Sequence, residues 1–132
     1  MSPFKTASAW VLGLIHAANG LLMLAAPLAW YQAVPTVPGT GPFNPHFVRD
    51  IGSAYLAAGL GLLWLARDAR AWAGAFVGSL FLGLHGLTHV WDLLAGREEL
   101  AHFAIDGVLV LLPTVWALWL SWPRGRAPGA AA

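Results

Sequence analysis

The chain has 132 residues, of which 58% are apolar and only 10% are charged. Soluble domains typically carry about 25% charged residues, so this composition excludes an ordinary soluble domain and predicts an integral membrane protein. The absence of cysteine excludes disulfides, thiolate metal sites and iron–sulfur clusters, and a net charge of +1 supplies no basic surface for nucleic acid, which we exclude as a partner.

Four apolar segments are long enough to cross a bilayer, which takes about 20 residues in a helix. The first, 7–30, lies in the uncharged run between Lys5 and Arg49 and ends near a Pro/Gly-rich loop. Its length exceeds the roughly 7 to 15 apolar residues of a secretion-signal core, which disfavours cleavage. The other spans are expected at 46–66, 71–94 and 100–122, separated by the short polar connectors 67–70 and 96–99.

The charges predict how these spans are arranged. Connectors this short force neighbouring helices to run antiparallel. One side of the membrane would hold most of the cations, namely Lys5, Arg67, Arg70, Arg124 and Arg126, whereas the other holds only Arg97 beside two glutamates. By the positive-inside rule both termini are cytoplasmic. We therefore expect an all-α fold, a single four-helix antiparallel transmembrane domain over 1–122, and a disordered Pro/Gly/Ala-rich tail over 123–132.

Seven side chains that could bind a metal lie within the last three spans. They are His46 and Asp50, then His85, His89 and Asp92, then His102 and Asp106. In each span they recur at three or four residues and so share one helix face. Their depths, counted at about 1.5 Å per residue, fall in the same half of the membrane. Because an ionisable group in hydrocarbon is costly unless paired or hydrated, we expect these faces to meet in a polar pocket open to the periplasmic or extracellular side.

The strongest specific interpretation of this pocket is a metal site, because helical bundles hold metals through imidazole and carboxylate groups on facing helices. The ion would be iron, zinc, copper or manganese. A site with two ions would use Asp50 or Asp106 as a bridge. A site with one ion would use His85 and His89 with one of those aspartates, and Asp92 would then orient a histidine.

Three further polar residues belong to the candidate site. Arg49 lowers metal affinity if it faces inward, so we expect it to pair with Asp50, Asp92 or Asp106, or to hold an anionic group of a substrate. His16 and Asn19 form a weaker polar stripe on the first span. A solitary histidine among apolar residues usually donates to a backbone carbonyl. A haem between His16 and His85 is disfavoured, because it would displace much of a small bundle.

The tryptophans have a simpler explanation. Six of the eight lie near span ends, where indole rings favour the membrane interface: Trp10, Trp30, Trp64, Trp72, Trp119 and Trp122. Trp91, which is adjacent to Asp92, is the one candidate for lining the pocket.

A resemblance to a known family lies in the segment FNPHFVRDIGSAYLAAG (43–59), in the glycine-rich span that this segment begins and in the short loop before it. In these features the chain resembles the small four-helix bacterial membrane proteins called DoxX-like. The resemblance implies a bacterial inner membrane protein with an accessory role in quinone-dependent oxidation, and it assigns no functional residue. Membrane hydroxylases and desaturases are a poorer match, because the sequence lacks their HxxHH boxes.

Three functions follow as hypotheses. The first is a membrane metalloprotein with one or two ions, acting as an oxidoreductase, or as accessory to one, on a quinone or another lipid-soluble substrate. The second is a proton-coupled transporter or channel that uses the same His/Asp/Arg pocket. The third is a non-catalytic subunit of a larger membrane complex, or a homo-oligomer. The pattern of residues assigns no catalytic residue.

Overall fold

The computed structural model describes residues 1–97 and 99–123, and every regular element among them is helical. The long helices are α1 (Pro3–Ala25), α3 (Pro45–Arg67) and α4 (Trp72–Leu94). The shorter elements are α2 (Pro27–Ala33), α5 (Leu100–Asp106), the π-helical turn η3 (Gly107–Leu111), α6 (Leu112–Ser121) and the 3-10 turns η1 (Val37–Gly39) and η2 (Ala69–Ala71). The all-α prediction is confirmed. Residues 124–132 of the tail, with Arg124 and Arg126, lie outside the described residues.

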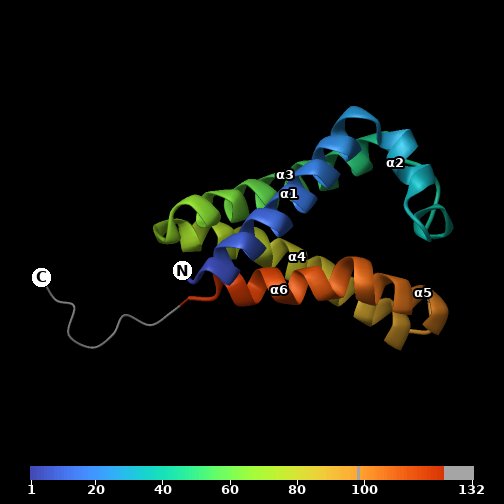
Figure 1. Cartoon of the computed structure of the whole chain (residues 1–132). Coiled ribbons are helices and arrows are strands. Elements are labelled where there is room, and N and C mark those ends of the chain that lie inside the picture. The colour runs from blue at the N-terminus through green and yellow to red at the C-terminus, as the bar shows by residue number, and fades with distance from the viewer. Residues whose placement is uncertain (98, 124–132) are drawn as a thin grey trace, which may run out of the picture.

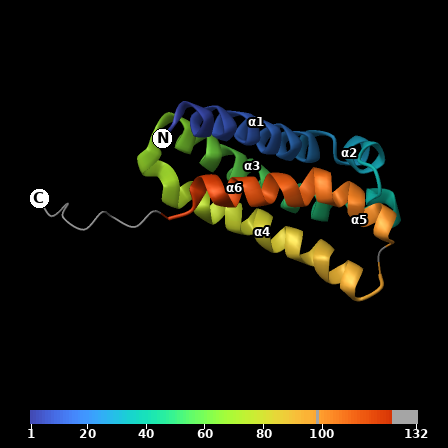
Figure 2. The same ribbon diagram turned by 60° about the horizontal axis from the view of Figure 1, so that its bottom comes forward.

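The helices form two arms that diverge toward one end of the molecule. Helix α3 packs against both α1 and α4, and α4 packs in turn against α6. Figure 1 shows α1 and α3 rising away from α4 and α6 toward the end that carries α2 and α5, and Figure 2 shows α4 running away from α1 toward the same end. The N-terminus, the connection between α3 and α4 and the end of α6 share the opposite end. The arms are therefore open at the α2/α5 end.

Three segments are long and apolar enough to cross a membrane: Pro3–Ala25, Ala69–Leu94 and Leu100–Ser121. Helix α3 has the same 23-residue length as α1 but is not among them. It carries three charged side chains, Arg49, Asp50 and Arg67, which lower its mean hydropathy. Its bounds nevertheless match the predicted segment 46–66 to within a residue at each end.

Prolines interrupt two of the expected spans. The first was expected to be continuous over 7–30, which is wrong, because α1 ends at Ala25 and α2 starts at Pro27. Pro27 has no N–H and disfavours helical geometry at Ala26, whose φ is −139° and ψ is 62°. In the last span Pro113 follows the π-helical turn, which separates α5 from α6. A proline at this position cannot bond the carbonyl of Leu109, so the preceding turn widens.

Glycines let α1 and α3 approach at backbone distance. A Cβ atom added at Gly59 would lie 2.4 Å from the Ala17 nitrogen, and one added at Gly20 would lie 2.5 Å from the Gly52 carbonyl oxygen. These distances are far below van der Waals contact. Small residues in helix seams of this kind are the usual means of close packing in membrane proteins. Contacts across the α4–α6 seam involve side chains instead, since a Cβ at Gly83 would first meet the Leu118 side chain at 3.2 Å.

A buried hydroxyl pair joins α4 to α6 near the closed end. The Ser121 hydroxyl lies 3.0 Å from the Ser79 hydroxyl and 2.8 Å from the Ala117 carbonyl, and both serines are 0% exposed. Interhelical hydrogen bonds within membrane proteins contribute about 0.6 kcal/mol on average.

We expect Ser79→Ala and Ser121→Ala each to lower the free energy of unfolding by about 1 kcal/mol, with a coupling of about 0.5 kcal/mol in the double variant. The measurement is reversible unfolding in mixed micelles. Ser53→Ala is the matched control, because Ser53 is exposed and bonds only the Arg49 carbonyl of its own helix. Additive losses at the two serines would contradict a direct hydrogen bond.

Candidate functional site

Four of the predicted residues come together between α4 and α5, at the open end of the molecule. The His89 Nδ1 atom lies 2.6 Å from the Asp106 carboxylate, and the His89 Nε2 atom lies 3.4 Å from the His85 Nε2 atom. The His102 Nε2 atom is 3.6 Å from the same Asp106 oxygen. We call His85, His89, His102 and Asp106 the histidine cluster. Its pairs arise from i, i+4 spacing within α4 and within α5 and from the packing of these two helices.

Asp106 is the most enclosed member of the histidine cluster. Its side chain is 6% exposed, against 22% for His89 and 26% for His102. A buried carboxylate requires partners, and here both are imidazoles. As a carboxylate, Asp106 only accepts, so the His89 Nδ1 atom carries the proton and the His89 Nε2 atom presents its lone pair toward His85. The π-helical turn begins at the next residue and sets how α5, with Asp106, is rotated relative to α6.

Aromatic rings continue the histidine cluster toward the interior. The ring of His85 lies 5.8 Å from that of Tyr55 and 6.2 Å from that of Phe81, and the ring of Tyr55 lies 5.8 Å from that of His16. His16 is 5% exposed, and its Nε2 atom has no hydrogen-bond partner among the described residues. Tyr55 was not among the residues predicted from the sequence. The signal was present, because Tyr55 shares the small-residue face of α3 with Gly52 and Gly59.

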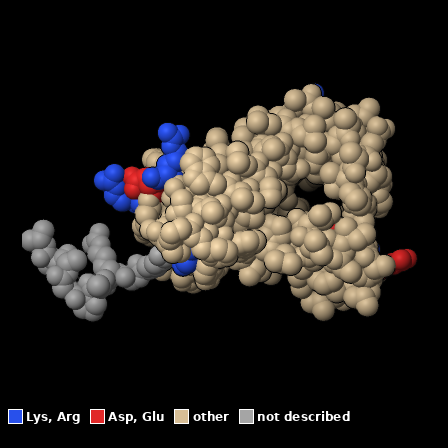
Figure 3. Space-filling view, in the orientation of Figure 1, with Lys and Arg blue, Asp and Glu red and all other residues tan. Residues whose placement is uncertain are grey.

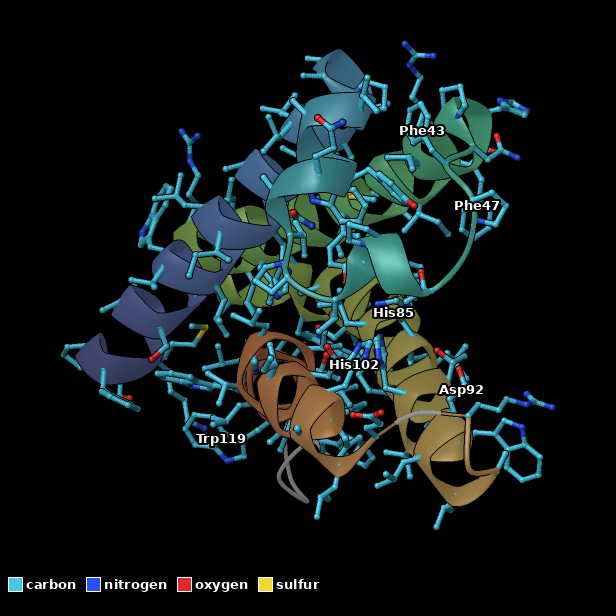
Figure 4. All side chains as sticks on the ribbon, turned by 90° about the vertical axis from the view of Figure 1, so that its right-hand side faces the viewer. Phe43, Phe47, His85, Asp92, His102 and Trp119 are labelled. Atoms are coloured by element: carbon cyan, nitrogen blue, oxygen red, sulfur yellow. The ribbon has the colours of Figure 1, made fainter. Side chains whose placement is uncertain are left out.

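The histidine cluster borders the opening between the two arms. In Figure 3 the surface is pierced at the α2/α5 end, between the part formed by α1, α2 and α3 and the part formed by α4 and α5. Figure 4, which looks in from that end, shows His85 and His102 pointing into the space between α4 and α5. A small molecule or ion can therefore approach the imidazoles from this end.

The structure places His46 and Asp50 elsewhere. They pair with each other at 3.7 Å in the first turns of α3, where their side chains are 88% and 61% exposed. The buried face of α3 is instead formed by Val48, Gly52 and Tyr55. The expectation that the polar stripe of this helix turns inward is corrected on this point. Val48 occupies the buried side of these first turns, so His46 and Asp50 lie on the exposed side of the helix.

The remaining candidates also have partners outside the histidine cluster. Asp92 pairs with Arg97 at 3.3 Å and lies at the outer edge of α4 (Figure 4). The Arg49 Nε atom donates to the Leu24 carbonyl at 3.3 Å rather than to an aspartate. Asn19 accepts a 2.8 Å hydrogen bond from the Trp30 indole, which ties α2 to α1. Trp91, the candidate for lining the pocket, is 61% exposed.

The histidine cluster offers few ligands to a metal. Within residues 1–97 and 99–123, no group of three or more His, Cys, Asp or Glu side chains is arranged so that all could hold one ion. The pair of facing imidazole nitrogens of His85 and His89 is the nearest approach to such a site. No protein family, no curated protein and no solved structure matches this chain.

Proposed function

We propose that this chain is an integral membrane protein that binds one metal ion between His85 and His89. The membrane placement is supported by the three segments that are long and apolar enough to span a bilayer and by the many large apolar side chains on the surface. In Figure 3 the charged residues of the visible face gather toward the two ends, with uncharged surface between them. Helix α3 completes a four-span bundle with both termini on the cytoplasmic side, in a bacterial inner membrane.

The separation of the two imidazole nitrogens carries the metal proposal. Two histidine nitrogens bound to one tetrahedral ion at about 2.0 to 2.1 Å lie about 3.3 Å apart. The His85 and His89 Nε2 atoms lie 3.4 Å apart. The other ring nitrogen of His89 faces Asp106, and a carboxylate in this place orients a metal-binding histidine and raises its basicity. The donor set therefore fits a single ion with positions left for water or a substrate.

This arrangement assigns new roles to the aspartates. Asp106 orients His89 and does not bridge two ions, so one ion is favoured over two. Imidazole ligands suit copper, zinc and iron, and the ordinary order of affinities places copper first. When bound, the ion would supply a Lewis-acid or redox centre open to the outer side. A quinone or another lipid-soluble molecule entering between the arms is the proposed substrate, in an oxidoreductase or an accessory to one, as the DoxX-like resemblance implies.

Metal titration of the purified protein tests the proposal. We expect protein stripped with a chelator in mild detergent to bind close to one Cu²⁺ or Zn²⁺ per chain. His85→Ala and His89→Ala should each weaken binding by about tenfold or more, because each removes one of two protein ligands. His46→Ala is the matched control, because His46 is exposed and pairs only with Asp50. Wild-type protein that binds no ion, or a double His85→Ala/His89→Ala variant that binds as wild type does, would refute the proposal.

A proton-coupled carrier is the second candidate function. One observation favours it: titratable side chains contact one another from His102 through Asp106, His89, His85 and Tyr55 to His16. Such a series could move protons inward from the open end. On the cytoplasmic side of His16, the interior of the described chain holds hydroxyl groups such as those of Ser8 and Ser79 but no buried titratable side chain. Proton flux into vesicles by metal-free protein would favour this function over the metal site.

A further inference from the structure

A second feature lies at the closed end of the molecule, on the outer surface where α1 and α3 meet. A hollow of about 420 Å³ is lined by Trp10 of α1 and by Leu60, Leu63, Trp64 and Arg67 of α3. The four residues from α3 are spaced three or four positions apart in the sequence, so they form one stripe along the helix. Leu60 lies about 10 Å from Arg67 along the helix axis, so the hollow extends from the end of the helix toward the middle of the membrane.

Among the described residues at this end, Arg67 has a guanidinium without a partner. The neighbouring carboxylate, Asp68, accepts bonds from Arg70 at 2.8 to 3.1 Å, and the bonds from Arg70 hold the pKa of Asp68 below its ordinary value. Lys5, another cation at this end, has a partner as well, because its Nζ atom lies 4.2 Å from the ring centroid of Trp119. Within the described part of the chain, no hydrogen bond or ion pair engages the guanidinium of Arg67.

The two indoles of the hollow are also free to donate. Trp64 is 63% exposed and Trp10 is 39% exposed, and neither donates an indole hydrogen bond to a described residue. A hollow with apolar walls, one unpaired cation and two indole N–H groups matches an amphiphile with a negative headgroup. Arginine and tryptophan together at the membrane interface favour phosphate oxygens and the adjoining glycerol region.

We propose that this hollow binds one anionic phospholipid of the cytoplasmic leaflet. Arg67 takes the phosphate, Trp10 and Trp64 flank the headgroup, and an acyl chain lies along Leu63 and Leu60. The proposal rests on the membrane placement proposed above and is independent of the metal site. A neutral phospholipid binds less well, because its choline group brings a positive charge near the guanidinium.

Native mass spectrometry of detergent-purified protein with added phosphatidylglycerol or phosphatidylcholine provides the test. We expect wild-type protein to bind one phosphatidylglycerol in preference to phosphatidylcholine. Arg67→Gln should weaken phosphatidylglycerol binding about fivefold, the effect of one cation near a lipid surface. Arg70→Gln removes the same charge from the same end, but Arg70 is occupied by Asp68, so binding should be unchanged.

Three results would overturn the proposal: equal losses in the two variants, no preference between the lipids, or displacement of the lipid by an equal concentration of inorganic phosphate. The first would indicate diffuse charge, and the last a phosphate site that does not use the acyl chains. Flotation of the protein with phosphatidylcholine vesicles separates this proposal from the membrane placement. Protein that floats but shows no lipid preference contradicts only the lipid site, whereas protein that does not float contradicts the membrane placement.

Discussion

Asp106→Asn is expected to lower the metal affinity of the protein by about 10- to 100-fold while leaving both proposed ligands in place. The 2.6 Å contact between Asp106 and the His89 Nδ1 atom fixes the tautomer that exposes the Nε2 lone pair. An asparagine amide is neutral and can present either its oxygen or its NH₂ group to the ring, so the tautomer is no longer enforced. Competition titration against a chelator of known affinity measures the effect.

Asp92→Asn is the matched control for this prediction. Asp92 lies three residues from His89 on the same helix, but it pairs with Arg97 and is 45% exposed. Its replacement should change metal affinity by less than about twofold, in keeping with the small effects of exposed ion pairs. The ¹⁵N shifts of His89 provide a readout that a merely structural role would not move, because they report the tautomer directly. Unchanged ¹⁵N shifts and unchanged affinity in Asp106→Asn would exclude the orienting role.

Gly59→Leu is expected to produce the largest loss of stability. The Cβ atom alone would lie 2.4 Å from the backbone nitrogen of Ala17 and 2.8 Å from the Gly13 carbonyl oxygen. Backbone atoms cannot turn aside as a side chain can, so α1 and α3 must separate. We expect a loss of about 3 kcal/mol or more, the upper end of the cost of overpacking.

Gly74→Ala serves as the control for Gly59→Leu, because an added Cβ at Gly74 meets no atom within 4 Å. Here the gain in helix propensity, up to about 1 kcal/mol, should leave the protein equally stable or more stable. Unfolding in mixed micelles, followed by circular dichroism, measures both variants. A Gly59→Leu protein as stable as wild type would show that the seam between α1 and α3 is looser than described.

The sequence predicted the bounds of the helices better than it predicted which side of each helix points into the bundle. Apolar run length and polar connectors placed α3 and α4 to within a residue or two of their observed ends. The break at Ala26 and the π-helical turn before Pro113 were missed, although both prolines are visible in the sequence. A proline within an apolar run marks a place where the helix is disturbed. A prediction from the length of the run alone ignores such prolines.

Part of the site could be predicted because it is local. His85 and His89 share a face by spacing, and so do His102 and Asp106, so packing α4 beside α5 was enough to join the two pairs. The placement of His46 and Asp50 could not be predicted in this way. It depends on which face of α3 the glycines turn toward α1. Depth along a helix does not determine rotation about its axis.

The divergence of the two arms has a mechanical consequence for the site. All four members of the histidine cluster belong to α4 and α5, whereas Tyr55 belongs to the glycine-packed pair of α1 and α3. A motion that widens or narrows the gap would change the spacing between His85 and Tyr55, whereas the contacts of His89 with His85 and Asp106 lie within one arm. Opening of the gap for a small molecule would therefore leave the geometry of the proposed metal ligands unchanged.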